Sequence, residues 1–460
     1  MTTPRKTSRH IAVIDVGKTN AKLALVDGAT MTEMDVVTRP NTVLAGPPYP
    51  HFDLDGHWAF LLESLAAFHA QHGVDAISVT THGASIVLLE QVGALACPML
   101  DYEYHGPDDI ADTYDQIRPD FSETGSPRLP GGLNVGAQLH WLFDTDPTLL
   151  DRTKHIITYP QYWGYRLTGN LACDVTSLGC HTDLWNPWDG KPSSLVARLG
   201  ISEKLAPARQ SSHILGDLDR TVSLITGLSP DTPVVCGIHD SNASLVPYLN
   251  HGSQPISVVS TGTWVVCMTL GGRQAPQLDA QRDTLINVNA LGEPVPSARF
   301  MGGREYEIIR NGSEALPTDQ DRQQVHRKKI MLLPSVVTES GPFPRQKMQW
   351  TVPPETDGQR IYALSLYLAL MTDRCLDLTG GRGRTIVEGP FVGNSDYLGM
   401  LNSLREGRVE AALSQTGTSV GAAMLIKKPA NSGSGFSAEE PPDRHFPRYA
   451  QQWLSALSRR

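Results

Sequence analysis

I-A-V-I-D-V-G-K at Ile11–Lys18 and I-S-V-V-S-T-G-T at Ile256–Thr263 are two versions of one pattern, and they stand 245 residues apart in the chain. Each is an apolar strand that ends in a tight turn with one glycine, and a second apolar run follows, over 21–26 or 264–268. This pattern is typical of a β-hairpin with a short polar tip. The repeat predicts two halves that begin with the same hairpin, although two unrelated hairpins would also look alike at this level.

The residues around the hairpins predict alternating helices and strands. Helical spacing over 58–69 precedes a buried-strand pattern over 76–80, and 234–237 has the pattern of another short strand. In the second half, a helix over 362–378 ends at two glycines, and a strand over 385–388 follows it. This order indicates an α/β protein. We expect an N-terminal domain over 10–250, a C-terminal domain over 251–430 and a C-terminal tail over 431–460, and residues 427–446 have the composition of a flexible segment.

Composition excludes several classes of protein. The chain has 460 residues, of which 40% are hydrophobic and 19% charged, as in ordinary globular proteins. Its net charge of −9 has the wrong sign for a general nucleic-acid binder, so no nucleic-acid partner is expected. The six cysteines include no C-x-x-C pair, which disfavours a zinc module or a disulfide framework and fits a reducing compartment.

No membrane segment or export signal is expected. The most apolar long stretch, Ile361–Met371, has 11 residues, against the ~20 that cross a bilayer. The apolar run that follows the basic N-terminus is broken at Asp15, which leaves no signal peptide. We therefore expect a cytoplasmic protein with no membrane partner, and the sequence leaves both a monomer and a homodimer open.

The first hairpin tip, D-V-G-K-T-N, has the residue types of a phosphate and magnesium site. The strand-end carboxylate of Asp15 can hold Mg²⁺, usually through water, while amides and side chains of the turn hold phosphate oxygens. An ordinary hairpin turn is the simpler alternative. A Walker A loop is disfavoured, because it needs a glycine where Ala12 stands and a helix where 21–26 continues as a strand. The candidate phosphate contacts are Gly17, Lys18, Thr19 and Asn20.

The second tip, S-T-G-T-W (Ser260–Trp264), presents hydroxyls and amides without a charge. Two such tips facing each other across a cleft would enclose a polyphosphate from both sides. The candidate phosphate contacts of this tip are Thr261, Gly262 and Thr263.

Two of these segments resemble motifs of a known family. G-I-H-D-S-N-A-S (Gly237–Ser244) and S-T-G-T-W, about twenty residues later, resemble motifs of the FGGY family of carbohydrate kinases, and within it those of the rhamnulokinase and fuculokinase group. The resemblance covers roughly residues 10–426. It implies an α/β fold of two duplicated RNase H-like domains, as in actin-like ATPases and sugar kinases, with a nucleotide and sugar cleft between them.

The resemblance also implies a reaction. A kinase of this group transfers the γ-phosphate of ATP, with Mg²⁺, to a terminal primary hydroxyl of a small-molecule sugar, here a deoxy-ketohexose with L-rhamnulose as the expected substrate. L-fuculose, a pentulose such as L-ribulose or D-xylulose, and the aldose L-rhamnose are alternatives. A non-catalytic sensor of sugar and nucleotide, built on the same fold, is an alternative of another class.

By the same resemblance, Asp240 is the general base and His239 contacts the sugar. A sugar hydroxyl is a poor nucleophile, and a positioned carboxylate can accept its proton as the bond to phosphorus forms. Asp240 also follows a short strand and precedes an apolar run, so the role of a helix N-cap is an alternative or an addition.

Further sugar contacts are expected beyond other strand ends, where the crevice of an open α/β fold lies. The resemblance assigns such contacts to His82 and Gly83, which follow the strand over 76–80. Asp101 and Tyr102 are expected to bind hydroxyls and to cover the sugar, although their segment departs from the usual family pattern.

The adenosine side is expected in the second half. E-G-P-F-V-G-N (Glu388–Asn394) takes the place of the family's glycine-rich turn, with an atypical middle. A small-residue segment over 415–424 resembles a helix start beside the nucleotide, with tight helix packing as the alternative. The candidate nucleotide contacts are Gly389, Gly393, Asn394 and Gly417.

Two other groups receive no role in the site. M-G-G-R, at Met301–Arg304, falls near the expected phosphate or nucleotide loops without a firm alignment. Cys173, Cys180, His181 and Asp183 invite a metal interpretation, but their spacing matches no standard site, so we expect buried cysteines instead.

Overall fold

The structure is a computed structural model that describes residues 9–91, 93–249, 255–271, 278–406, 408–412, 417–427, 436–438 and 445–459. These residues form two units. Unit 1 holds the described residues within Met1–Pro247, Ile286–Pro294 and Thr416–Ser432, and unit 2 those within Tyr248–Leu285, Val295–Gln415 and Gly433–Arg460. Within the described residues, no helix has both the length and the apolar character that a membrane span requires.

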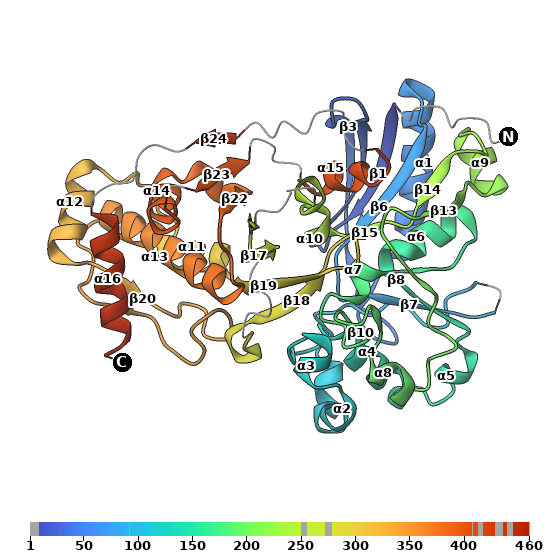
Figure 1. The fold of residues 1–460 in the computed structure, drawn as a ribbon. Coiled ribbons are helices and arrows are strands. Elements are labelled where there is room, and N and C mark those ends of the chain that lie inside the picture. Colours follow the sequence, from blue (N-terminus) through green and yellow to red (C-terminus); the bar gives the residue numbers. More distant parts are fainter. Residues whose placement is uncertain are drawn as a thin grey trace. The chain divides into compact units, whose positions relative to one another are not determined.

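Unit 1 is built on a seven-stranded sheet with the order β13-β14-β6-β1-β2-β3, in which β15 also pairs with β6 (Figure 1). β1, β2 and β3 are antiparallel neighbours, whereas β6 runs parallel to β1, and β14 and β15 run parallel to β6. The strands of this sheet are β1 (His10–Val16), β2 (Asn20–Asp27), β3 (Thr32–Pro40), β6 (Ala76–Thr81), β13 (Ile214–Asp217), β14 (Pro233–Val235) and β15 (Ile238–His239).

Two helices cover opposite faces of this sheet. α1 (Leu54–His72) buries Leu61 and Leu65 in one core cluster with Ile14 and Ile77. Successive side chains of a strand point to opposite faces, so Ser78 points the other way, and its hydroxyl donates to the Ala422 carbonyl of α15 (Gly417–Met424) at 2.7 Å. Asp15 lies on this second face as well.

Short elements complete unit 1. The remaining strands are β4 (Val43–Leu44), β5 (His51–Phe52), β7 (Ile86–Leu89), β8 (His155–Thr158), β9 (Cys173–Asp174), β10 (Trp185–Asn186), β11 (Lys191–Pro192) and β12 (Ala208–Arg209). The remaining helices are η1 (Gly106–Ile110), α2 (Ala111–Ile117), α3 (Phe121–Thr124), α4 (Val135–Thr145), α5 (Leu149–Arg152), α6 (Tyr159–Thr168), α7 (Val175–Leu178), α8 (Ser194–Arg198), α9 (Arg220–Thr226) and α10 (Asp240–Ala243).

The sheet of unit 2 contains the order β19-β17-β16-β22-β23-β24. β19, β17 and β16 are antiparallel neighbours, and β22 and β23 continue parallel to β16. Within β18 the chain passes from unit 2 into unit 1 at Ile286, and at the start of β19 it returns to unit 2 at Val295. The strands are β16 (Ile256–Thr261), β17 (Val265–Leu270), β18 (Thr284–Val288), β19 (Pro294–Phe300), β20 (Leu332–Leu333), β21 (Gln349–Trp350), β22 (Arg384–Glu388), β23 (Val409–Ala412) and β24 (Phe436–Ala438).

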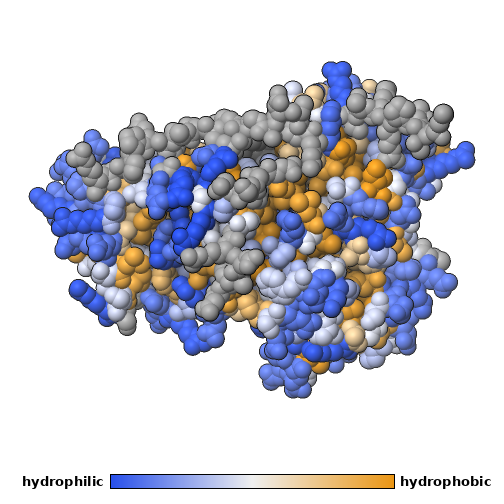
Figure 2. Space-filling view, viewed as in Figure 1, coloured by the Kyte–Doolittle hydropathy of each residue, from blue (hydrophilic) through white to orange (hydrophobic). Residues whose placement is uncertain are grey.

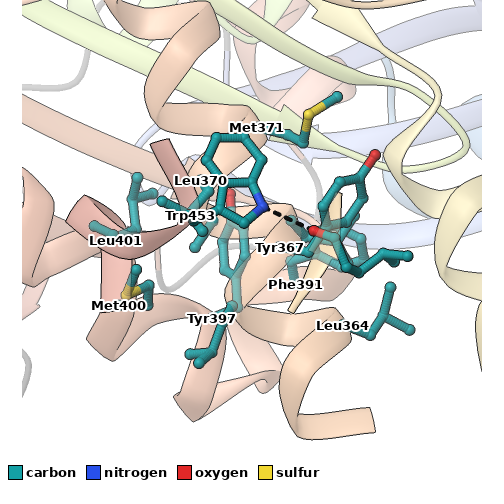
Figure 3. Close-up of a cluster of buried hydrophobic side chains, with 14 of the residues drawn as sticks. Leu364, Tyr367, Leu370, Met371, Phe391, Tyr397, Met400, Leu401 and Trp453 are labelled. Atoms are coloured by element: carbon teal, nitrogen blue, oxygen red, sulfur yellow. Dashed lines mark hydrogen bonds between the residues drawn. The ribbon is translucent and has the colours of Figure 1, made fainter. Parts of the chain in front are cut away.

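A 22-residue helix, α13, forms the centre of the unit 2 core, and most of its side chains are buried. Leu364, Tyr367, Leu370 and Met371 from this helix pack in one cluster with residues of α14 and α16 (Figure 3). The helices of unit 2 are η3 (Ala280–Arg282), α11 (Gly302–Arg310), α12 (Asp319–Lys328), α13 (Asp357–Leu378), η4 (Pro390–Gly393), α14 (Ser395–Leu404) and α16 (Phe446–Leu457), and η2 (Val246–Tyr248) lies at the boundary between the units.

The two sheets share one plan, which confirms the repeat predicted from the hairpins. β1-β2 and β16-β17 are both antiparallel hairpins, in register from Val16↔Ala21 and from Thr261↔Val265. Each first strand then has a parallel neighbour, β6 or β22, on its other side. The continuation of the first hairpin as β2 also confirms that the G-K-T tip does not open a helix.

Two parts of the chain differ from the expected domain organisation. α15, which we expected in the C-terminal domain, lies in unit 1 because it packs on α10 and β1. The expected tail contains α16, whose Phe446, Tyr449 and Trp453 are buried in the unit 2 core. Their helical spacing is an amphipathic signal, and the Trp453 indole donates to the Leu332 carbonyl at 2.7 Å (Figure 3). Most of 427–446 lies outside the described residues.

Candidate active site

The tip of the β1-β2 hairpin is a closed turn held by a neighbouring asparagine. The Gly17 amide donates to the Asn20 carbonyl at 2.9 Å. Asn41 donates from its side chain to the Gly17 carbonyl at 2.8 Å and from its backbone to the Thr19 carbonyl at 2.9 Å. Thr19 and Asn20 are exposed, so their polar groups remain available to a ligand.

Asp15 is held next to the tip by a cross-strand ion pair. It lies opposite Lys22 in the β1-β2 register, and Lys22 Nζ is 3.2 Å from Asp15 Oδ2. The hydroxyl of Ser419, on α15, lies 3.3 Å from the same oxygen. Burial raises the pKa of the Asp15 carboxyl, the charge of Lys22 opposes this rise, and the negative charge of Asp240 adds to it. The two carboxylates are therefore close enough to interact.

The carboxylate oxygens at this site fit a magnesium ion. Mg²⁺ prefers oxygen ligands and usually keeps several waters, with one or two carboxylates and the phosphates of a substrate. Asp15 supplies such a carboxylate, and the repulsion between it and Asp240 is the kind that a dication relieves. Among the described residues, no group of three or more His, Cys, Asp or Glu side chains forms a cage of its own.

Lys18 lies among the expected sugar contacts. Its ammonium group pairs with Asp101 and lies 3.3 Å from Glu103 Oε2. It also lies over the rings of Phe52, at 5.0 Å, and Tyr102, at 4.7 Å. The tip and the Asp101 segment thus meet, and Lys18 is engaged with the groups expected at the sugar.

His82 forms the centre of an aromatic cluster at the end of β6. Its ring centroid is 5.0 Å from that of Phe52, 5.2 Å from that of Tyr102 and 5.1 Å from that of Tyr159. Burial lowers the pKa of His82 to about 4, so the ring is neutral at neutral pH. Its Nδ1 lies 2.9 Å from the Gly83 carbonyl, whereas the buried Nε2 has no hydrogen-bond partner among the described residues. Such an atom is suited to a hydroxyl of a ligand.

Gly83 allows His239 to approach this cluster. A Cβ atom at position 83 would lie 2.7 Å from His239 Nε2, so a side chain there would force the His239 ring to shift. His239 Nε2 in turn lies 3.1 Å from Asp240 Oδ1 and 3.8 Å from Cys180 Sγ. Burial works to lower the pKa of His239, but the negative charges of Cys180 and Asp240 raise it above its ordinary value. His239 is therefore a cationic partner for Asp240.

Among the described residues, only one oxygen of Asp240 takes part in hydrogen bonds or ion pairs. Its Oδ1 accepts from the Ser241 amide at 2.6 Å and from the Ser241 hydroxyl at 3.3 Å, in addition to His239. No contact to Oδ2 is found among the described residues, and the side chain is about one-third exposed. The N-cap of α10 is His239 and not Asp240, so the capping alternative does not account for this carboxylate.

A buried polar network holds β15, the strand that ends at His239 immediately before Asp240. The His239 amide donates to Thr176 Oγ1 at 2.9 Å, and the Thr176 hydroxyl donates to the Asp174 carboxylate. Asp174 also accepts from the Ser211 hydroxyl at 2.8 Å, and Gln161 donates to the Cys236 carbonyl at 2.7 Å. The sequence analysis missed these residues, although D-V-T-S at 174–177 has the pattern of a helix N-cap.

The two glycine-containing loops expected at the nucleotide meet within unit 2. β16 and β22 are parallel neighbours with Ser260 opposite Glu388, so the loops that follow them are adjacent. The Thr261 hydroxyl donates to the Glu388 carbonyl and accepts from the Phe391 amide at 3.1 Å. Gly389 has a φ of 85°, and a Cβ there would lie 2.0 Å from the Thr261 carbonyl oxygen. Only glycine fits this position.

The second half of this loop has a structural role that the sequence did not indicate. Asn394 caps α14 by accepting from the Tyr397 amide at 3.0 Å, and its side-chain amide donates to the Ser365 hydroxyl at 3.0 Å. The polar groups of Asn394 are thus occupied in this structure. Gly393 is exposed, with open space around it.

M-G-G-R opens α11 against the second hairpin tip. The Gly303 amide donates to the Thr263 carbonyl at 3.1 Å, and a Cβ on Gly303 would lie 2.1 Å from the Gly262 carbonyl oxygen. The segment therefore supports the tip that contains Gly262 and Thr263.

For the small residues of α15, the sequence left two interpretations open, a helix start beside the nucleotide and tight helix packing. A Cβ at Gly421 would lie 1.9 Å from the Ala243 carbonyl oxygen, so tight packing on α10 requires glycine there. Gly417, at the first position of α15, is two residues from Ser419, which contacts Asp15. Gly417 thus belongs to unit 1, whereas the Gly389 loop belongs to unit 2.

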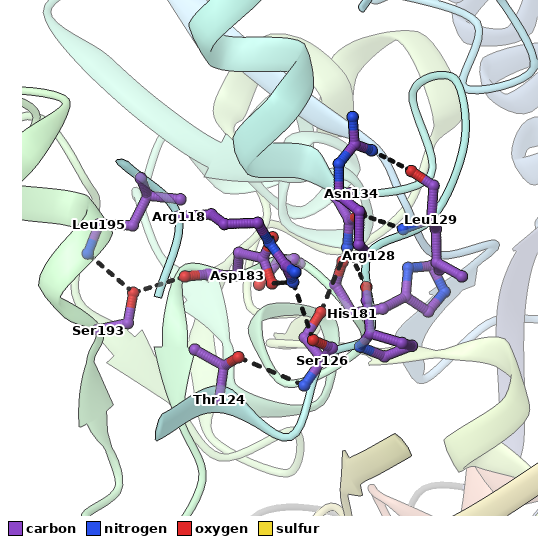
Figure 4. Close-up of polar contacts among 12 residues, drawn as sticks. Arg118, Thr124, Ser126, Arg128, Leu129, Asn134, His181, Asp183, Ser193 and Leu195 are labelled. Atoms are coloured by element: carbon purple, nitrogen blue, oxygen red, sulfur yellow. Dashed lines mark hydrogen bonds and ion pairs between the residues drawn. The ribbon is translucent and has the colours of Figure 1, made fainter. Parts of the chain in front are cut away.

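Asp183 lies in a hydrogen-bond network that holds the loop around Ser126 (Figure 4). Asp183 accepts from the Tyr114 hydroxyl at 2.6 Å and from Arg118, which also donates to the Ser126 carbonyl at 3.0 Å. The Asn134 side chain donates to the His181 carbonyl at 2.9 Å. Cys173 and Cys180 are buried.

Comparison with known proteins agrees with this architecture. The sequence model of the FGGY family of carbohydrate kinases, N-terminal domain, matches residues 10–247, and that of the carbohydrate kinase FGGY, C-terminal domain, matches residues 253–434. A carbohydrate kinase from Novosphingobium aromaticivorans is 36% identical, with a TM-score of 0.89 over 97% of this chain and 100% of that one.

Two curated relatives match a smaller part of the chain. An L-fuculokinase from Salmonella typhi is 25% identical over 279 residues, which are 59% of this chain and 58% of that protein. A rhamnulokinase from Pectobacterium atrosepticum is 28% identical over 270 residues, which are 56% of this chain and 52% of that protein. The chain thus spans about half the length of the curated relatives that it matches.

The duplicated sheets and their strand-end sites define a two-domain α/β protein with the fold of sugar kinases, which confirms the expected fold class. The chain belongs to the FGGY family of carbohydrate kinases.

Proposed function

We propose that this protein is an ATP-dependent sugar kinase that uses Asp240 as its general base. The observation that carries the proposal is the carboxylate of Asp240, whose Oδ1 is fully engaged while Oδ2 remains open at a strand end beside a buried, unsatisfied His82 nitrogen. An open carboxylate oxygen can accept the proton of a sugar hydroxyl as that hydroxyl attacks the γ-phosphorus of ATP.

The residues of this chain divide the work as follows. His239 holds Asp240 in place through Oδ1 and balances its charge. His82 Nε2 and the Asp101 carboxylate bind sugar hydroxyls, and the hairpin tips bind phosphate oxygens through their amides. Asp15 would hold Mg²⁺, which offsets negative charge on the transferred phosphate.

The proposed acceptor is a terminal primary hydroxyl of a deoxy-ketohexose, with L-rhamnulose as the best candidate. The partly exposed ring of Tyr102, beside His82, is an aromatic group that could pack on the methyl group of a 6-deoxy sugar. The similarity to a rhamnulokinase and to an L-fuculokinase supports the same substrate class.

Coupled ADP release, with Mg²⁺ and ATP, tests this proposal against L-rhamnulose, L-fuculose, L-rhamnose, D-xylulose, L-ribulose and glycerol. Turnover that is strongest with L-rhamnulose supports the full proposal. Strong turnover with another sugar keeps the kinase and replaces the substrate. Nucleotide binding without turnover on any sugar contradicts the kinase proposal and favours a sensor.

A further inference from the structure

A separate cavity of about 360 Å³ lies in unit 2, between α12 and α16. None of its lining residues belongs to the candidate active site. Four come from α12, three from α16, and the other two are the residues that end α12 and begin α16. The lining residues are Arg322, Gln323, His326, Arg327, Lys329, His445, Arg448, Tyr449 and Gln452.

The helical spacing of these residues explains why they share a cavity. Residues 322, 323, 326 and 327 lie on one face of α12, and 448, 449 and 452 lie on one face of α16, because positions three and four apart are neighbours on a helix. Figure 1 shows the two helices near each other, and the end of the molecule that carries α12 is strongly hydrophilic in Figure 2.

The described lining residues carry positive charge and include no carboxylate. Four of its nine residues are Arg or Lys and two are His, in a chain whose net charge is −9. Arg327, Lys329 and Arg448 are exposed, and the described residues place no carboxylate within ion-pair distance of them. Arg327 donates to the neutral Gln324 side chain at 2.8 Å. These three charges remain available to an anion.

The floor of the cavity is held rigidly. Arg322 donates through two nitrogens to the two oxygens of Asp396, at 3.0 Å each, which fixes its guanidinium plane. His326 bonds the Tyr362 hydroxyl at 2.8 Å, and its ring packs against those of Tyr449 and His445. The Tyr449 hydroxyl donates to the Ile330 carbonyl at 2.9 Å. An anion would therefore meet preformed walls.

We propose that this cavity binds a small anion with two phosphate groups. The guanidinium groups of Arg327 and Arg448 approach it from different helices, so each can bind one phosphate through paired N–H donors, as arginine does. Lys329 adds a third charge beside Arg327. A cavity of this volume accommodates a ligand the size of a bisphosphorylated sugar or a diphosphate.

Isothermal titration of the purified full chain with pyrophosphate tests the proposal. The double variant Arg327→Gln, Arg448→Gln removes two charges from the cavity. The matched control, Arg209→Gln, Arg459→Gln, removes two exposed arginines outside it. We expect the cavity variant to bind at least about tenfold more weakly and the control to bind as the wild type does. Both variants should keep the wild-type melting temperature, because the substituted side chains are exposed.

The competing outcomes are distinct. No binding of pyrophosphate to the wild type, or an equal loss in both variants, would overturn the proposal, because general electrostatics would then suffice. Inorganic phosphate that binds as tightly as pyrophosphate would contradict the two-phosphate assignment. Loss of pyrophosphate binding in Lys18→Gln, with the cavity variant unchanged, would locate the anion in the candidate active site. The assay measures binding alone, so its result does not depend on kinase activity.

Discussion

Asp240 is made available to a substrate by the way its neighbours use its other oxygen. His239 and Ser241 occupy Oδ1, and Gly83 leaves the space in which the His239 ring lies. The His239 ring also lies 3.1 Å from Asp240 Oδ1 and so fixes the position of this oxygen. At this scale, the site depends on a glycine as much as on its charged residues.

Substitution of this glycine should therefore damage the chemistry more than the fold. In Gly83→Ala, the added methyl group collides with His239 Nε2 and displaces the partner of Asp240. We predict that kcat falls by up to about 100-fold, because small displacements of catalytic groups are costly. Steady-state kinetics measures this effect, and Gly399→Ala serves as the matched control. A Gly83→Ala enzyme with wild-type kcat would show that the close approach is dispensable.

Thr176 offers a second test, on stability. Thr176→Val removes the hydroxyl that accepts from the His239 amide and donates to Asp174, so two buried polar groups lose a partner. We predict a loss of about 1–3 kcal/mol in the free energy of unfolding. Thr176→Ser, which keeps the hydroxyl, should lose much less. Equal losses for Val and Ser in chemical denaturation would assign the effect to packing and not to the hydrogen bonds.

Sequence reasoning predicted where polar side chains follow strand ends better than it predicted which residues those side chains contact. The positions of the hairpin tip and of His82 at strand ends could be predicted from the local pattern, whereas the roles proposed for Asp101 and Asp240 came from the family resemblance. The pairing of Lys18 with Asp101 could not be predicted, since it depends on how two loops 83 residues apart come together. Asn394 is a different case. Its side chain was expected to contact the nucleotide, and in the structure it caps α14.

At the scale of elements, α15 comes from the second part of the chain and packs on β1 and α10. Its Ser419 contacts Asp15, and its Gly421 lies against α10, the helix that begins at Asp240. The position of this helix therefore affects both candidate carboxylates. Sequence patterns gave the helix itself, but its membership of unit 1 follows only from its packing.

Gly421→Ala should move α15 away from α10. The new Cβ would lie 1.9 Å from the Ala243 carbonyl oxygen, a backbone atom that cannot turn aside. We predict a destabilisation of about 1–3 kcal/mol, as in other overpacked sites, together with reduced kcat. Thermal unfolding and kinetics measure both effects. Val420→Ala, on the same helix, is the control, and identical behaviour of the two variants would contradict the packing role of Gly421.

At the scale of the whole molecule, the duplicated plan could be predicted because each half begins with its own copy of one hairpin. Long helices and buried strands were also recognisable, since their periodicity extends over many residues. The short strands β9 to β12 and the helix α7 were not, because two to four residues carry no periodic signal and form through long-range contacts.

The buried histidines predict how stability depends on pH. Burial lowers the pKa of His57 and of His82 from 6.5 to about 4. Between these values the unfolded chain binds more protons than the folded chain, so the free energy of unfolding rises with pH. We predict that this contribution is complete above about pH 6.5 and is lost as the pH falls towards 4. Denaturation at several pH values measures it. His57→Gln should show a shallower fall, and an equal slope in both proteins would contradict this account.

The central claim is that Asp240 removes the proton from a sugar hydroxyl during phosphoryl transfer. The most direct test is the rate at which labelled γ-phosphate passes from ATP to the preferred sugar in the wild type and in Asp240→Asn, with nucleotide binding and melting temperature measured on the same preparations. The account predicts that the variant binds nucleotide and melts as the wild type does, while its transfer rate falls by about 10²–10⁴-fold. A folded Asp240→Asn protein that transfers phosphate at a near wild-type rate would contradict it.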